Sequence, residues 1–168
     1  MIVVDTREKP RAIVKILDEF ERQGVAYERR KLNFGDYADP ARLPGIVIDR
    51  KQTLGEVCAN VVQGHARIVR EIERCNASGC RLVFLVEHSN RIRKLEDVIG
   101  WKNPRLKVSP LAVSGERLFR IMKAMEIRYG IKWQFCSKAQ TGKRIIEILG
   151  GEKNETEPAR EDPGLDGP

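Results

Sequence analysis

The hydrophobic positions at the start of the chain change from the period of a strand to that of a helix. Residues 2–6 contain a short apolar run of the kind that forms a buried strand. Pro10 suits a first helical turn, and apolar residues then recur three and four positions apart until Gly24. This pattern predicts a strand followed by an amphipathic helix.

Three more strands are expected before residue 52. Residues 26–32 are typical of a partly exposed strand, and the runs 35–39 and 46–51 flank a loop that contains two prolines. We expect the last two runs to form an antiparallel hairpin. If the pairing is symmetric about the loop, Asp36 lies opposite Asp49, where Cβ atoms are about 4.5–5.5 Å apart. The length of the loop does not fix this register.

The chain beyond the hairpin alternates between helical and apolar strand patterns. Thr53 followed by Glu56 is a capping-box pattern that marks a helix start. Residues 81–87 are mostly apolar, as in a central strand covered on both faces. The elements expected here are helices over 54–63, 65–77, 95–99, 116–129 and 138–149, and strands over 81–87 and 131–135.

The element order predicts one α/β domain over residues 1–150, with a mixed central sheet flanked by helices. Residues 151–168 are acidic, rich in Pro and Gly, and lack apolar periodicity. Such a segment does not recover the entropy of ordering, so we expect a disordered acidic tail.

The net charge of +7 changes this picture, because it is unevenly distributed. Residues 152–166 hold six acidic and two basic side chains, so the chain before residue 152 carries about +11. A basic body favours a polyanionic partner, with nucleic acid ahead of a membrane surface. No apolar run approaches the roughly 18 residues that span a bilayer, and no charged-then-apolar leader precedes residue 2. We therefore expect a cytoplasmic protein.

The cysteines and histidines do not form a zinc pattern. The four cysteines, expected to be reduced thiols, include no pair separated by two residues, and there are two histidines. At 168 residues with 41% hydrophobic content, the chain can bury a core without disulfides or a structural metal.

Acidic side chains recur where the first strands end. Asp49 and Lys51 are two residues apart in a strand, so both side chains point to the same face. Asp5 closes the first strand, and Asp36 leads into the hairpin. Three carboxylates and a lysine at strand ends predict a site for a divalent cation, because carboxylate oxygens suit hard ions.

These segments carry a family resemblance. The ordered set Val4-Asp5-Thr6-Arg7-Glu8, Gly35-Asp36 and Ile48-Asp49-Arg50-Lys51 resembles the nuclease domain of XPF/Hef-type structure-specific endonucleases. That family has V-D-x-R-E, then G-D, then E-R-K-x-x-x-D, and the resemblance covers about residues 1–90. It implies a restriction-endonuclease-like fold of the PD-(D/E)XK type and a metal-dependent phosphodiesterase that acts on branched DNA.

The resemblance also implies roles for individual residues. Asp36, Asp49 and Lys51 would be catalytic, with Asp36 and Asp49 holding Mg²⁺ or Mn²⁺ and Asp5 as a further metal ligand. The family's first glutamate is Asp49 here, and its trailing aspartate falls at Gly55. The adjacent Glu56 either replaces that aspartate or only caps the helix.

A second group of residues is expected to contact DNA. The forked guanidinium groups of Arg7 and Arg50 suit phosphate oxygens, although Arg50 could equally form a surface salt bridge. Arg67 matches an arginine of the family. Trp101 lies among Lys102, Arg105 and Lys107, a combination that could stack a base and hold phosphates, and Trp101 could equally pack the domain.

The sequence thus predicts a Mg²⁺- or Mn²⁺-dependent endonuclease acting on branched or flap-like DNA in repair, recombination or phage DNA processing. The alternatives are a catalytically inactive nucleic-acid-binding module and a Holliday-junction resolvase. The expected partner is DNA. A homodimer is a further expectation, and neither a small-molecule cofactor nor a membrane is expected.

Overall fold

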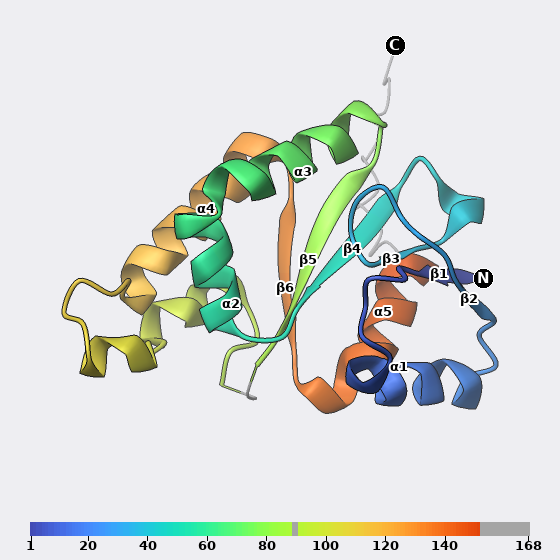
Figure 1. Ribbon diagram of the computed structural model, residues 1–168, viewed down its shortest axis with the longest axis horizontal. Coiled ribbons are helices and arrows are strands. Elements are labelled where there is room, and N and C mark those ends of the chain that lie inside the picture. Colours follow the sequence, from blue (N-terminus) through green and yellow to red (C-terminus); the bar gives the residue numbers. More distant parts are fainter. Residues whose placement is uncertain (89–90, 152–168) are drawn as a thin grey trace, which may run out of the picture.

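A computed structural model describes residues 1–88 and 91–151 of the chain. Its centre is a six-stranded mixed sheet with helices on both faces (Figure 1). The strands are β1 (Ile2–Val4), β2 (Tyr27–Arg29), β3 (Tyr37–Ala38), β4 (Ile46–Lys51), β5 (Arg81–Glu87) and β6 (Lys132–Cys136). The α-helices are α1 (Pro10–Arg22), α2 (Leu54–Cys58), α3 (His65–Ala77), α4 (Gly115–Tyr129) and α5 (Thr141–Gly150).

Short helical turns connect these elements. A π-helical segment, η2 (Ala59–Gln63), continues α2, and 3₁₀ turns occupy η1 (Pro40–Arg42), η3 (Leu95–Gly100), η4 (Pro104–Lys107) and η5 (Lys138–Gln140). The helix expected over 54–63 is therefore α-helical only in its first half. The expected helix over 95–99 is a 3₁₀ turn.

The strand order is β2-β1-β3-β4-β5-β6. β3 is antiparallel to β1 and to β4, whereas the β1–β2, β4–β5 and β5–β6 pairs are parallel. The expected hairpin is present in the expected register, because Tyr37 pairs with Ile48 and Ala38 with Val47. The register places Asp36, which precedes β3, next to the end of β4 that carries Asp49.

The helices form two layers, one on each face of the sheet (Figure 1). α1 and α5 cover one face, where Ile13, Phe20 and Ile145 pack against Ile48. α2, α3 and α4 cover the other face, where Leu54, Ile72 and Met122 belong to the same core as Val47 and Phe84. Successive residues of β4 therefore enter different cores, as the period of a strand requires.

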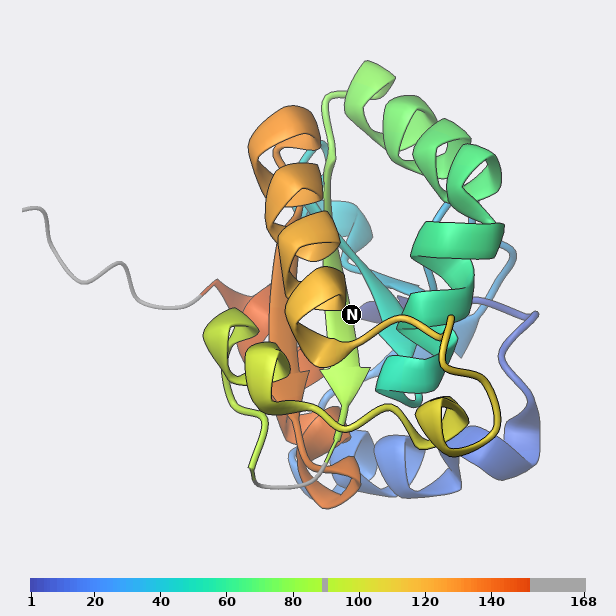
Figure 2. The same cartoon turned by 90° about the vertical axis from the view of Figure 1, so that its left-hand side faces the viewer.

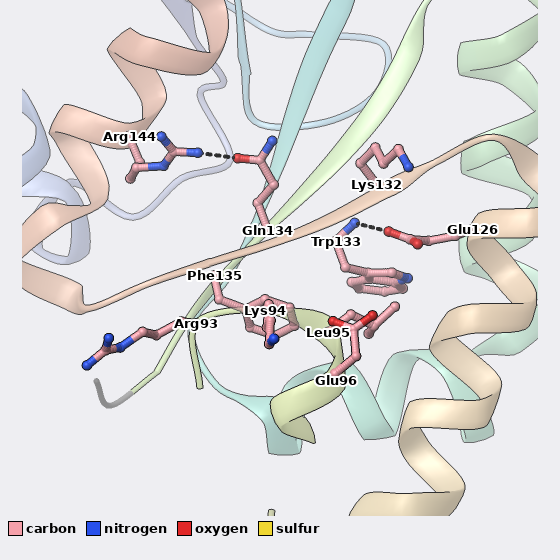
Figure 3. Close-up of a pocket in the computed structure, with 10 residues that line it drawn as sticks. All are labelled: Arg93, Lys94, Leu95, Glu96, Glu126, Lys132, Trp133, Gln134, Phe135 and Arg144. Carbon is pink, nitrogen blue, oxygen red and sulfur yellow. Dashed lines mark hydrogen bonds between the residues drawn. The ribbon is translucent and has the colours of Figure 1, made fainter. Parts of the chain in front are cut away.

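β6 forms one edge of the sheet and β2 the other, and on β6 a side chain blocks a backbone amide (Figure 3). The Trp133 amide donates a hydrogen bond to the Glu126 carboxylate of α4 at 3.0 Å, and Arg144 of α5 donates to the Gln134 amide oxygen at 2.6 Å. A side chain that caps an edge amide removes one site of pairing with another strand.

Among residues 1–88 and 91–151, no helix is both long enough and apolar enough to cross a membrane. The acidic segment expected to be disordered lies, apart from Gly151, outside the described residues.

Candidate active site

The end of β4 brings a carboxylate and an ammonium together on the face covered by α2 and α3. Asp49 and Lys51 are both buried, and Lys51 Nζ lies 2.7 Å from Asp49 Oδ1. The ammonium also lies 5.6 Å from the centroid of the Phe84 ring on β5. The ring and the carboxylate hold the Lys51 side chain at this end of the sheet.

Asp36 is fixed beside this pair by both its backbone and its side chain. Its amide donates to the Ile48 carbonyl at 2.7 Å, and its Oδ2 accepts from the Arg50 amide at 2.8 Å. The Asp36 carbonyl in turn accepts from the Asp5 amide at 2.8 Å. These bonds connect Asp36 to β4 on one side and to the end of β1 on the other.

The turn before Asp36 requires glycine. Gly35 has φ +64°, and a Cβ atom there would lie 2.5 Å from Val47 Cγ1 and 2.9 Å from the Ile48 carbonyl oxygen. The left-handed backbone and the close approach to β4 both exclude a larger residue. Glycine at 35 therefore allows the chain to place Asp36 against β4.

The two carboxylates destabilise each other's charge. Burial is the largest cause that raises the pKa of Asp36 well above its usual value, and the nearby Asp49 and Glu8 raise it further. Burial also raises the pKa of Asp49 to about 6, although Lys51 opposes this shift. A buried carboxylate and a half-buried one that repel each other are stabilised by an added cation.

Lys51 remains an ammonium in this arrangement. Burial alone would lower its pKa, but the attraction and hydrogen bond of Asp49 outweigh burial, and the pKa is raised. A protonated lysine suits the stabilisation of negative charge, whereas a general base would need a lowered pKa.

Asp5 is occupied with Arg7. The buried Asp5 carboxylate accepts from Arg7 Nε at 2.7 Å and Arg7 Nη2 at 3.1 Å, and from the Leu32 amide at 2.6 Å. Burial would raise the pKa of Asp5, but these hydrogen bonds outweigh it and lower the pKa. The Arg7 side chain is 55% exposed, so Asp5 holds a guanidinium at the surface.

Arg50 lies on the opposite face from Asp49 and does not reach the surface. Its side chain is 1% exposed, with Nε 3.0 Å from Glu8 Oε2 and Nη1 2.9 Å from Glu87 Oε1. The expected phosphate contact of Arg50 is therefore wrong, because α1 and α5 cover this face. A salt bridge forms, as the alternative interpretation expected, but it is buried and not at the surface.

Two of the three expected ligand carboxylates lie together. Among the residues that the structure describes, no three side chains of His, Cys, Asp or Glu gather as ligands, and Asp5 is already bonded to Arg7. The residues present still fit a divalent ion. Asp49 Oδ1 is buried, and its contact among the described residues is the Lys51 ammonium at 2.7 Å. Mg²⁺ is commonly held by one or two carboxylates together with substrate phosphates.

Sequence reasoning missed Glu71 and Glu87. Glu71 of α3 accepts from the Gly35 amide at 3.0 Å, and its charge also raises the pKa of Asp49. Glu87 ends β5 and joins Arg50 to the Thr141 hydroxyl, which donates to it at 2.9 Å. The only hint of Glu87 in the sequence is an acidic residue that ends an apolar strand.

Glu56 is engaged as a helix cap. Its Oε2 accepts from the Gln52 amide at 2.8 Å, while its own amide donates to Thr53 Oγ1 at 3.0 Å. The negative charge of Glu56 nevertheless contributes to the raised pKa of Asp49. Glu56 thus caps α2 beside the site.

The remaining expected DNA contacts lie on two surfaces. Arg67 is exposed in the first turn of α3. Lys102 and Arg105 are exposed around η4, where Trp101 is half-buried and packs against the core on the α4 side. Arg67 lies one helical turn before Glu71, which accepts from the Gly35 amide, whereas Lys102 and Arg105 lie at the η4 end of the molecule.

Comparisons with known proteins agree with this architecture. The family model described as the ERCC4 domain matches residues 4–149. XPF from Aeropyrum pernix matches with a TM-score of 0.64 and 21% identity, over 92% of this chain and 67% of that chain. XPF from Aeropyrum pernix in complex with DNA matches with a TM-score of 0.60 and 22% identity, over 89% of this chain and 62% of that chain.

This chain therefore spans about two thirds of the length of the archaeal chains. Among curated proteins, none matches. The structural likeness confirms the expected restriction-endonuclease-like fold.

Proposed function

Because the chain belongs to the ERCC4 domain family, we propose that it is a DNA endonuclease that hydrolyses phosphodiester bonds with Mg²⁺ or Mn²⁺. The observation that carries this proposal is the convergence of Asp36, Asp49 and Lys51 on one face at the end of β4. Binding to DNA alone would not favour buried carboxylates there, because they repel phosphate.

Asp36 and Asp49 are the residues that would hold the ion. A bound divalent cation would supply a Lewis acid that activates water and neutralises charge on the scissile phosphate. The repulsion between the two carboxylates favours this role, because a cation between them would relieve it. Asp5 would not contact the ion and would instead orient Arg7.

Lys51 and Arg7 would act on the phosphate. The Lys51 ammonium stabilises the negative charge that develops on the phosphate oxygens as the bond to the leaving group breaks. The exposed fork of Arg7, held on one side by Asp5, would orient the DNA backbone with its remaining donors. Together these groups place the phosphate over the two carboxylates.

The substrate is proposed to be branched or flap-like DNA, in repair, recombination or phage DNA processing. The matched archaeal XPF is described in complex with DNA, which supports DNA as the partner. A homodimer and a cytoplasmic location stay predictions from the sequence.

Cleavage assays on flap, fork, four-way-junction and single-stranded DNA test the proposal. We expect cleavage with Mg²⁺ or Mn²⁺ and none with EDTA. Asp49→Asn and Lys51→Ala should each slow cleavage by about a hundredfold or more while DNA affinity is kept. The matched controls Asp18→Asn and Lys15→Ala, exposed on α1 across the sheet, should cleave normally.

The outcomes separate the alternatives. Cleavage that survives Asp49→Asn would refute the assignment of the site. DNA binding without cleavage under any metal would favour the inactive binding module. Paired nicks confined to the four-way junction would favour a Holliday-junction resolvase.

A further inference from the structure

The surface around η4 exposes aliphatic side chains that nothing in the proposed chemistry uses. Val108 is 85% exposed, Leu111 88% and Leu106 39%. Exposed apolar side chains are ordinary when they are scattered, but three within six residues form a cluster that indicates an interaction site. We call this cluster, together with Lys102, Arg105 and Lys107, the η4 surface.

The charges of the η4 surface favour a polyanion. Lys102, Arg105 and Lys107 are exposed among the three aliphatic residues, and Arg117 is exposed in the first turns of α4. Arg105 and Arg117 both act electrostatically on the Cys58 thiol of α2, so both lie within reach of that helix. Neighbouring cations of this kind bind successive phosphates of a nucleic acid.

The backbone of the η4 surface is held in one shape. Buried Asn103 accepts from the Arg105 amide at 3.0 Å and donates to the Val113 carbonyl at 2.9 Å, which joins the two ends of the loop. Gly115 lies so close to the η3 turn that a Cβ would be 2.5 Å from the Val98 and Trp101 carbonyl oxygens. A loop fixed in this way loses little conformational entropy on binding.

The η4 surface lies at the end of the sheet that carries the proposed site. A cavity of about 230 Å³ separates the loop from α2 and η2, and Gly55, Cys58 and Arg105 are among the residues that line it. Figure 2 shows η4 next to α2. Because α2 begins three residues after Lys51, DNA bound at the site would pass near this loop.

A second groove borders the same loop. It has a volume of about 770 Å³, and Trp101, Lys102 and Leu106 are among the residues that line it. Asn103 lines both hollows, so the loop forms a ridge between two depressions. The exposed aliphatic side chains of this ridge lie beside its lysine and arginine side chains. This arrangement suits a ligand that presents flat apolar faces beside phosphates.

We infer that the η4 surface binds the unpaired bases of branched DNA, with Val108 and Leu111 against base faces and Arg105 and Lys107 on phosphates. This inference rests on the proposed function and names the part of the substrate that is recognised. A continuous duplex presents phosphates and groove edges, and aliphatic side chains reach base faces only where bases are unstacked or unpaired.

Binding measured by fluorescence anisotropy in EDTA tests this inference without cleavage. The ligands are a fork with two unpaired arms and a fully paired duplex of the same length. Val108→Ser/Leu111→Ser should weaken fork binding roughly tenfold and duplex binding by no more than about twofold. The matched control Ile127→Ser, a 77% exposed aliphatic residue of α4 outside the η4 surface, should change neither.

The cationic half of the surface should behave differently. Arg105→Ala/Lys107→Ala should weaken fork and duplex binding alike. The slope of log affinity against log salt concentration should fall by about one for each side chain removed. Lys132→Ala, at the blocked β6 edge, is the matched control for charge (Figure 3).

Three results would overturn the inference. One is unchanged fork binding by Val108→Ser/Leu111→Ser, the second is an equal loss on fork and duplex, and the third is a wild type that does not prefer the fork. If light scattering shows a wild-type dimer and a monomeric variant, the surface is instead an interface between copies of this chain. Failure of the proposed function has a different signature, which is wild-type protein that binds DNA but cleaves none of it.

Discussion

Replacing Arg50 by methionine should destabilise the fold by about 3–5 kcal/mol and leave DNA affinity unchanged. The sequence left a phosphate contact and a surface salt bridge open for this residue, whereas the structure buries its guanidinium on the face that α1 and α5 cover. The two roles predict opposite results, since a phosphate contact at the surface affects binding and a buried ion pair affects folding.

The magnitude follows from the groups that would lose their partner. Glu87 is 4% exposed and would keep only the Thr141 hydroxyl, whereas Glu8 is 13% exposed and reaches water more easily. Removal of one partner of a buried ion pair costs about 3–5 kcal/mol, because an uncompensated charge stays buried. Most of the cost should therefore fall on Glu87.

Urea denaturation of Arg50→Met, Glu87→Gln and the double variant measures this cost as a cycle. Glu87→Gln removes the charge and keeps an amide oxygen for Arg50, so it should cost about 1–2 kcal/mol. In the double variant, no charged Glu87 is left buried without its arginine, so the two single losses should not add. The coupling free energy between positions 50 and 87 should be about 2 kcal/mol. Arg11→Met, at an exposed position of α1, is the matched control for loss of an arginine.

A loss below about 1 kcal/mol for Arg50→Met, accompanied by weaker DNA binding, would refute the buried-network interpretation.

Two further predictions test other parts of the structure. Gly35→Ala should lower the free energy of unfolding by about 1–3 kcal/mol and slow cleavage, because φ is +64° and the new Cβ would meet Val47 Cγ1. Gly24→Ala has a similar φ but open space around it, so a thermal melt should show a smaller loss of stability. Equal losses in the two variants would contradict the steric part of the argument. Burial raises the pKa of Cys75 to about 12, so its thiol stays neutral at pH 8 and should resist iodoacetamide until the protein unfolds. Peptide mass spectrometry measures the alkylation, and rapid labelling of Cys75 in native protein would contradict its buried position.

The local parts of the fold were predictable because they depend on neighbouring residues. β4 has the bounds expected from its apolar run, the hairpin has the symmetric register, and Thr53 caps α2 as its spacing with Glu56 indicated. The π-helical continuation over Ala59–Gln63 was not predictable, because no spacing rule separates it from an ordinary helix.

The partners of the site residues were less predictable than the residues themselves. Glu71 is thirty-six residues from the Gly35 amide that it accepts from, and nothing in its helix marks it as different from an exposed glutamate. Asp5 looked like a ligand because it ends a strand, but Arg7 two residues later takes both of its oxygens. Strand ends indicate where chemistry occurs, whereas the packing of distant segments decides which carboxylates remain available.

Arg50 connects the two faces of the sheet through different atoms. Its amide donates to Asp36 Oδ2 and so fixes the position of a proposed metal ligand on one face, while its guanidinium joins Glu8 and Glu87 on the other. A slip of one residue in the register of β4 would exchange these faces and bury Asp49 and Lys51 under α1 and α5. Because substitution of the side chain leaves the amide in place, Arg50→Met molecules that remain folded should keep Asp36 beside Asp49. Their cleavage rate per folded molecule should stay near that of the wild type, and a large loss would mean that the buried ion pairs also set the geometry of the site.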